Sequence, residues 1–143
     1  MSVSFKPEGY PTISPFLSLE DIEGFIEFVQ FVFGGEVTEK ILDGEGNILH
    51  AELTMGNSTL MMGPARGNPT KDIMLYTYTE DTDAAYQKIL DRGGVSIMPP
   101  GDQFYGDRNA GVKGPFGINW WIATRVEIVD SEEMQRRSLE MKG

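Results

Sequence analysis

The sequence predicts an α+β fold built from two copies of one module, each with the element order βαβββ. Residues 17–35 align without gaps with residues 76–94, and both segments run from a strand through acidic residues and a helix to a Gly-Gly pair. After each pair, the spacing of apolar residues changes from the helical period to the alternation of strands. The loop 63–71 (GPARGNPTK) separates the copies. The alternative is a chance likeness between two ordinary strand–helix units.

The first module is expected to begin with a strand at 13–19, in which Pro15 indicates an edge or a bulge. The next segment has apolar residues at helical spacing, with Asp21 as the N-cap and Gly34-Gly35 as the stop. Three strands joined by tight turns follow it. They are expected at 37–42, 48–55 and 59–62.

The second module repeats this order, with a strand at 73–78, a helix at 81–91 and a Gly-Gly stop. Three strands follow, and a long loop or hairpin arm (GDQFYGDRNAG) lies between the first two. These strands are expected at 95–98, 111–113 and 118–124. A short polar helix capped by Asp130 or Ser131 ends the chain. Within a single domain of 1–143, we therefore place module one at about 10–63, module two at about 72–126 and the last helix at about 130–141.

Composition restricts the partners of this protein. The formal net charge is −10 and the pI is near 4.5, so the surface repels nucleic-acid phosphates and anionic lipid headgroups. No cysteine is present, which excludes disulfides and a cysteine nucleophile. The N-terminal residues do not resemble a signal peptide, and no apolar run reaches the ~20 residues that span a bilayer. We therefore expect a cytoplasmic protein that binds neither nucleic acid nor membrane.

Five short motifs occur in an order and at spacings typical of one family. They are YPTISPFL at 10–17, HAEL at 50–53, FYGDR at 104–108, GPFGINW at 114–120 and DSEEMQRR at 130–137. Together they resemble the PhnB-like branch of the vicinal-oxygen-chelate superfamily, which includes glyoxalases, bleomycin-resistance proteins and dioxygenases. The resemblance implies paired βαβββ modules whose strands curl into a half-open barrel around a cavity. It also implies a homodimer.

The resemblance also implies where a metal would bind. Enzymes of that superfamily hold a divalent metal with ligands from four strands, and the metal polarises a substrate that carries two neighbouring oxygens. The matching positions are Ser14, Glu52, Ile73 or Met74, and Trp121. Only Glu52 is a good metal ligand among them, and Ile118 replaces a histidine that often follows PFG in such proteins. We therefore expect no metal and no other cofactor.

Side-chain alternation along two strands indicates which residues line the cavity. An apolar face, expected to pack under the helices, consists of Leu49, Ala51, Leu53 and Met55 in one strand and of Ile118, Trp120 and Ile122 in the other. The opposite faces hold His50, Glu52, Asn119 and Trp121. If the modules pair as the resemblance implies, these four side chains converge in the cavity.

Each of these candidates has alternative roles. His50, the single histidine, and Glu52 are compatible with a metal pair, a ligand-binding or general-base pair, or a hydrogen-bonded polar pair in a wet cleft. Trp121 could stack on a flat or cationic ligand, or merely fill space.

The arm at 104–108 supplies two further candidates. Tyr105 could provide an aromatic contact, and Arg108 could bind a carboxylate or a phosphate. For Arg108 we favour the alternative, a network centred on Asp107 and Arg108 that fixes the loop.

The function predicted from these residues is metal-independent binding of a small organic molecule, as in proteins of the glyoxalase/bleomycin-resistance type. His50, Glu52 and Asn119 would orient the ligand, and Trp121 and Tyr105 would contact it; the acidic surface would suit a cation. The alternative is a lyase, isomerase or dioxygenase acting on a vicinal-oxygen substrate through an atypical metal site or through His50 as a base. A third possibility is a structural or partner-binding module in which Trp121 fills the cavity.

Overall fold

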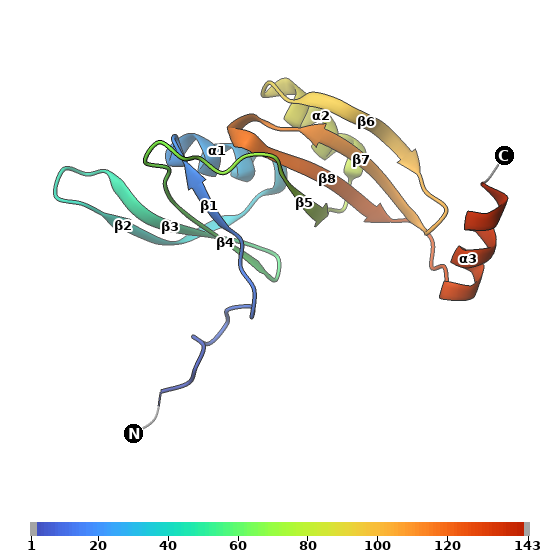
Figure 1. Ribbon diagram of the computed structural model, residues 1–143, viewed down its shortest axis with the longest axis horizontal. Coiled ribbons are helices and arrows are strands. Elements are labelled where there is room, and N and C mark those ends of the chain that lie inside the picture. Colours follow the sequence, from blue (N-terminus) through green and yellow to red (C-terminus); the bar gives the residue numbers. More distant parts are fainter. Residues whose placement is uncertain (1–2, 142–143) are drawn as a thin grey trace. The chain divides into compact units, whose positions relative to one another are not determined.

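The computed structural model describes residues 3–141, and the chain divides into two compact units between Lys71 and Asp72. Each unit has its own open four-stranded sheet and its own helix against that sheet (Figure 1). The element order in both units is βαβββ, which confirms the predicted α+β fold of two modules.

In module one the sheet order is β1-β4-β3-β2, with β1 parallel to β4 and the other pairs antiparallel. Its elements are β1 (Phe16–Leu19), α1 (Ile22–Phe33), β2 (Glu36–Leu42), β3 (Ile48–Met55) and β4 (Ser58–Pro64). Helix α1 begins where the Asp21 carboxylate accepts a hydrogen bond from the Gly24 amide at 2.9 Å. It ends at Gly34, whose φ of 75° suits a residue without a side chain. Both ends agree with the sequence prediction.

Helix α1 packs against β3 and β4, and apolar side chains from both layers form the core of module one. The fully buried ones are Leu17, Phe25, Val29, Ala51, Leu53 and Met62. The prediction for Leu49 was wrong, because this side chain is 42% exposed and Ile48 is buried instead. In the pairing of β2 with β3, Ile41 lies opposite His50, and the next residue, Leu42, lies opposite Ile48. Leu49 is therefore the extra, unpaired residue of a β-bulge, and the side-chain alternation is interrupted there.

Module two has the sheet order β5-β8-β7-β6, with β5 parallel to β8. Its elements are β5 (Ile73–Tyr78), α2 (Thr82–Asp91), β6 (Val95–Asp102), β7 (Asp107–Lys113), a 3₁₀ turn (Pro115–Gly117) and β8 (Ile118–Arg125). Helix α2 packs against β6, β7 and β8, and Asp81 caps its N-terminus. Ile118, Trp120 and Ile122 are buried on this side of β8, as their alternation predicts.

Strands β6 and β7 are longer than the sequence predicts. Strand β6 continues through Pro99 and Pro100 to Asp102, and β7 begins at Asp107 within the segment expected to be a loop or hairpin arm. An edge strand tolerates proline, because only one of its sides needs hydrogen bonds. Strand β6 is such an edge, and its register with β7 shifts between Met98 and Gly101.

The chain continues from β8 to α3 (Ser131–Glu140), which Asp130 caps as predicted. Arg137 connects this helix to the rest of module two by donating hydrogen bonds to the Phe104 carbonyl at 3.0 Å and to the Glu127 carboxylate at 2.9 and 2.7 Å. Within residues 3–141, no helix is long and apolar enough to cross a membrane.

Candidate functional site

Two predicted site residues, His50 and Glu52, meet on the face of the first sheet opposite α1, which we call the open face of module one. The His50 Nε2 atom lies 2.7 Å from Glu52 Oε2. The other carboxylate oxygen, Oε1, accepts a hydrogen bond from the hydroxyl of Tyr10. Both oxygens of Glu52 are therefore held by neighbouring side chains.

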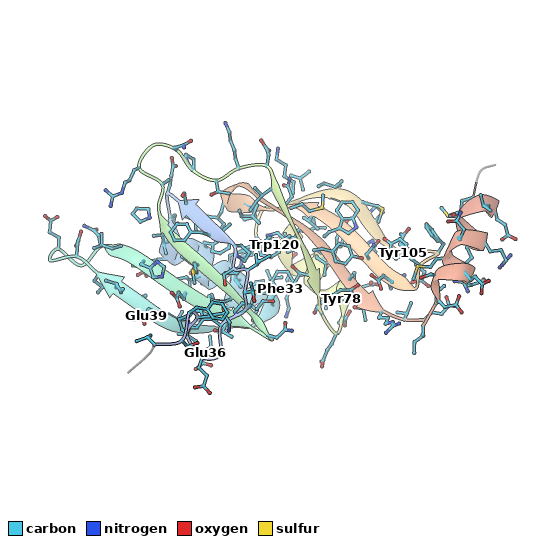
Figure 2. The ribbon with its side chains drawn as sticks, turned by 60° about the horizontal axis from the view of Figure 1, so that its bottom comes forward. Phe33, Glu36, Glu39, Tyr78, Tyr105 and Trp120 are labelled. Atoms are coloured by element: carbon cyan, nitrogen blue, oxygen red, sulfur yellow. The ribbon has the colours of Figure 1, made fainter. Side chains whose placement is uncertain are left out.

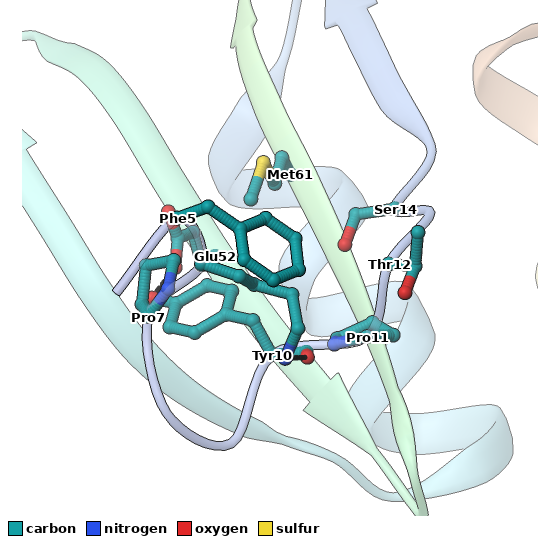
Figure 3. Close-up of a pocket in the computed structure, with 9 residues that line it drawn as sticks. Phe5, Pro7, Tyr10, Pro11, Thr12, Ser14, Glu52 and Met61 are labelled. Atoms are coloured by element: carbon teal, nitrogen blue, oxygen red, sulfur yellow. Dashed lines mark hydrogen bonds between the residues drawn. The ribbon is translucent and has the colours of Figure 1, made fainter. Parts of the chain in front are cut away.

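Tyr10 reaches Glu52 because the N-terminal segment crosses the open face of module one (Figure 3). Between this segment and the sheet lies a pocket of about 450 Å³. Its lining residues are Phe5, Lys6, Pro7, Tyr10, Pro11, Thr12, Ser14, Glu52 and Met61. The Lys6 ammonium donates a hydrogen bond to the Tyr10 carbonyl, and this bond links two residues of the pocket wall.

The carboxylate of Glu52 is buried, yet its environment favours the ionised form. Burial by itself would raise the pKa of Glu52, but hydrogen bonds from His50 and Tyr10 outweigh it and lower that pKa below its ordinary value of 4.5. The same contact has the opposite effect on the phenol. Donation to Glu52 raises the pKa of Tyr10, so the two groups keep a proton on the tyrosine and a charge on the carboxylate.

The His50 ring is positioned by an aromatic neighbour. It stacks on Phe16 with ring centroids 6.0 Å apart and an interplanar angle of 29°. Gly63 makes room for this arrangement, since a Cβ atom there would lie 3.1 Å from Cζ of Phe16. The imidazole is thus held between a carboxylate and an aromatic ring, with its side chain 26% exposed.

On module two, Asn119 and Trp121 lie on the sheet face opposite α2, which we call the open face of module two. Trp121 pairs across strands with Gly111, and its ring covers this glycine so closely that a Cβ atom would lie 2.2 Å from Cζ3. Trp121 remains partly exposed in this position, whereas its neighbour Trp120 is buried. The structure thus assigns the two adjacent tryptophans to opposite faces, as predicted.

Three tyrosines, an aspartate and an asparagine form a hydrogen-bonded cluster on the same open face, which we call the tyrosine cluster. Tyr76 and Tyr78 donate to Oδ2 of Asp107 at 2.7 and 3.0 Å. The Asn109 amide nitrogen donates to the hydroxyls of Tyr76 at 3.3 Å and of Tyr105 at 2.5 Å. Tyr78 projects from the end of β5, and Tyr105 from the turn between β6 and β7 (Figure 2). Partial burial, together with the hydrogen bond to Asp107, raises the pKa of Tyr76 strongly.

Arg108 lies on the other side of the second sheet, away from Asn119 and Trp121. Its guanidinium pairs with both carboxylate oxygens of Asp83 in α2, at 2.8 and 2.9 Å, and with Asp102 in β6 at 3.1 Å. The prediction of one loop-fixing network centred on both Asp107 and Arg108 was therefore wrong, because the two side chains have different partners. Both residues belong to strand β7, so they point to opposite faces, and Asp107 binds tyrosines instead.

A divalent metal of the kind used by enzymes with this fold does not fit the residues present. Within residues 3–141, no group of three or more His, Cys, Asp or Glu side chains is placed to hold a metal ion. Trp121, Ile73 and Met74 do not coordinate hard or borderline cations. Ser14, in the wall of the pocket, is a poor ligand, and Glu52 has both oxygens engaged by Tyr10 and His50.

The sequence prediction missed several residues of these sites. Tyr10 stands in a motif that was recognised, but its distance in sequence from Glu52 hides the contact. Alternation along β5 places Tyr76 and Tyr78 on one face and could have identified them. Asn109 was missed, and Asp107 was assigned to a loop network, because the segment was expected to be a loop or hairpin arm rather than a strand.

The comparisons with known proteins agree with this fold and these motifs. Residues 14–122 match the model of the Glyoxalase/Bleomycin resistance protein/Dioxygenase superfamily, and the chain belongs to this superfamily. An uncharacterized protein of Mycobacterium bovis is 27% identical over 137 residues, which cover 87% of this chain and 90% of that protein. A relative from Mycobacterium tuberculosis has the same identity, over 87% of this chain and 81% of its own length.

Solved structures share the fold at lower identity. A PhnB protein from Bacillus cereus is 21% identical with a TM-score of 0.67, over 80% of this chain and 99% of its own. TioX from Micromonospora sp. ML1 is 19% identical with a TM-score of 0.62, over the same shares. A glyoxalase/bleomycin resistance protein/dioxygenase from Nocardioides is 20% identical with a TM-score of 0.59, over 91% and 90% of the two chains. At these identities the likeness concerns the fold alone.

The Tyr10–Glu52 contact can be tested with the variant Tyr10→Phe. Removal of the hydroxyl takes away one of the hydrogen bonds that lower the pKa of Glu52, so this pKa is expected to rise. A carboxyl group whose pKa is lowered by folding stabilises the fold above its unfolded pKa, and this contribution is lost as the pH falls through the folded pKa. The variant should therefore lose less stability on acidification below pH 4.5 than the parent protein.

An NMR titration of the Glu52 carboxyl carbon measures this effect directly. Tyr86→Phe is the matched control, because Tyr86 donates to Ser96 at 2.7 Å in module two and does not contact Glu52. Equal Glu52 titration curves for the parent and Tyr10→Phe proteins would contradict the contact.

Proposed function

We propose that this protein binds a small organic molecule without the help of a metal ion. The observation that carries the proposal is the state of Glu52, the single ligating residue among the four positions that the superfamily uses for metal. Its two oxygens are occupied by Tyr10 and His50 beside a pocket of about 450 Å³. Pockets of this size suit small ligands, and a few polar groups within them orient the ligand.

Further residues support the same proposal. Trp121 and Asn119 share the open face of module two with Tyr105 and the tyrosine cluster, so aromatic surface and polar groups occur together there. On module one we propose that His50 and Glu52 orient a ligand, and on module two that Asn119 orients a ligand and Trp121 and Tyr105 contact it. Arg108 is a weaker candidate, because its guanidinium is already paired with Asp83 and Asp102. A homodimer and a cytoplasmic location also stay predictions.

Thermal unfolding of chelator-treated protein in the presence of a library of small organic molecules tests this function. A ligand at about 100 times its Kd should stabilise the fold by about 2.7 kcal/mol. Zn²⁺, Ni²⁺, Mn²⁺ and Fe²⁺ should give no stabilisation that depends on Glu52. The stabilisation by an organic ligand should weaken in His50→Gln for a ligand bound on module one and in Trp121→Ala for a ligand bound on module two. If no compound stabilises the protein, or if a metal does so and Glu52→Gln removes the effect, the proposal fails.

One observation favours a second function, proton transfer by His50. Glu52 holds one imidazole nitrogen at 2.7 Å, and within residues 3–141 the other nitrogen, Nδ1, has no protein partner. A carboxylate that orients an imidazole is the usual arrangement for a general base. On this alternative, the protein should exchange the carbon-bound hydrogens next to the carbonyl of hydroxyacetone with deuterium from D₂O. His50→Gln should abolish the exchange and leave the circular dichroism spectrum unchanged; an unaltered rate would exclude this role.

A further inference from the structure

We propose that the tyrosine cluster on the open face of module two is a recognition site for an organic cation, a ligand that carries an ammonium group next to an aromatic or aliphatic body. Asp107 and Asn109 would accept hydrogen bonds from the ammonium group, and Tyr76 and Tyr78 would contact the rest of the molecule. This inference rests on the proposed function and names the class of ligand.

The charge of Asp107 is the first support. Asp107 is only 7% exposed. The protein partners of its carboxylate are two phenols, which donate hydrogen bonds to Oδ2. Within residues 3–141, Oδ1 accepts no hydrogen bond from the protein. Arg125 stands opposite Asp107 in the register of β7 and β8, but it is exposed and forms no ion pair with it. A buried carboxylate is costly without a cationic partner, and a bound ammonium group supplies one.

Asn109 provides the second support. It is fully buried, and its Oδ1 atom has no hydrogen-bond partner among the described residues. The orientation of the amide follows from its neighbours. The single proton of the Tyr76 hydroxyl is donated to Asp107, so this hydroxyl must accept from the Asn109 nitrogen. A buried acceptor without a protein donor is unusual in a folded protein, and a bound ammonium group would supply the missing donor.

The aromatic groups around these acceptors provide the third support. Tyr76 and Tyr78 are 46% and 64% exposed and form an edge-to-face pair with centroids 5.5 Å apart. Trp121 lies beside Tyr76 in the register of β5 and β8. Exposed aromatic rings close to a carboxylate attract cations through their faces. The net charge of −10 also favours the binding of cations, because it raises their concentration near the protein.

Three probes of similar size and different charge test the inference: phenethylammonium, phenethyl alcohol and phenylacetate. NMR titration of ¹⁵N-labelled protein should show saturable binding of the ammonium probe, with shifts at β5 and β7, and at least about tenfold weaker binding of the other two. Asp107→Asn keeps the shape and the acceptor oxygen but removes the charge, and should weaken phenethylammonium binding about tenfold or more. Asp91→Asn on α2 is the matched control for the loss of one negative charge and should leave the affinity unchanged.

The outcomes separate this inference from the proposed function. If the alcohol binds as tightly as the ammonium probe, or if Asp107→Asn and Asp91→Asn weaken binding equally, the cation site is refuted while small-molecule binding stands. If none of the three probes shifts the β5 and β7 signals but a neutral library compound stabilises the protein, the class of ligand is wrong and the proposed function holds. Failure of the whole library refutes both. Because Asp107→Asn could disturb the sheet, Tyr78→Leu, which removes the ring of a more exposed residue, should also weaken binding of the ammonium probe.

Discussion

Replacing Trp120 by alanine is expected to lower the free energy of unfolding by about 3–5 kcal/mol, the usual cost of removing a large aromatic side chain from a core. Trp120 is 1% exposed and lies on the side of β8 that faces α2. Its register neighbours are Leu75 in β5 and Val112 in β7. Gly114 makes room for the indole, because a Cβ atom there would lie 2.9 Å from Cδ1 of Trp120. The core therefore has few ways to close the cavity that the substitution leaves.

Trp121→Ala is the natural comparison for this experiment. The two residues are adjacent in β8 and have the same side chain, yet Trp121 lies on the open face and is partly exposed. Its loss should reduce stability by less than half as much as the loss of Trp120, because the space left behind is open to solvent. Urea unfolding followed by circular dichroism measures both changes. Equal losses for the two variants would show that the indoles do not differ in burial as described.

Gly106→Ala is expected to destabilise module two by about 2–4 kcal/mol, from backbone strain and overpacking together. Gly106 has a φ of 101°, which residues with a side chain rarely adopt, and a Cβ atom would lie 2.3 Å from the Glu127 carbonyl oxygen. The amides of Val126 and Glu127 both donate to the carbonyl of Gly106, at 2.9 and 3.1 Å. The turn between β6 and β7 and the segment that leads to α3 are therefore joined at this residue.

Gly93→Ala separates the two causes. Gly93 has a φ of 94°, but a Cβ atom there would have no neighbour within 4 Å, so this variant carries the strain without the collision. It should cost about 1–2 kcal/mol, as expected for a residue forced into a left-handed conformation. Hydrogen exchange in Gly106→Ala should increase mainly in residues 126–140, because α3 loses part of its attachment. An equal loss of stability in the two variants would contradict the close contact at Glu127.

Much of the fold could be predicted because it depends on local chemistry. Asp21 and Asp130 cap their helices, as the sequence predicts, since a short side chain with an acceptor at that position satisfies a free amide of the first turn. The alternation that separates Trp120 from Trp121 follows directly from the period of a strand. Where these local rules compete with pairing, as at the Leu49 bulge and at Pro99 and Pro100, the prediction was wrong.

The sequence by itself determined the two βαβββ modules, the ends of their helices and the buried side of β8, because each depends on residue type and on spacing within a few positions. Only the tertiary structure decided which polar groups meet. Tyr10 and Glu52 are 42 positions apart, and Tyr76 and Asp107 are 31 positions apart. Strand register sets these contacts, and a shift of one residue would send each side chain to the opposite face. The partners of Glu52, Asp107 and Arg108 therefore became visible only when the strands were paired.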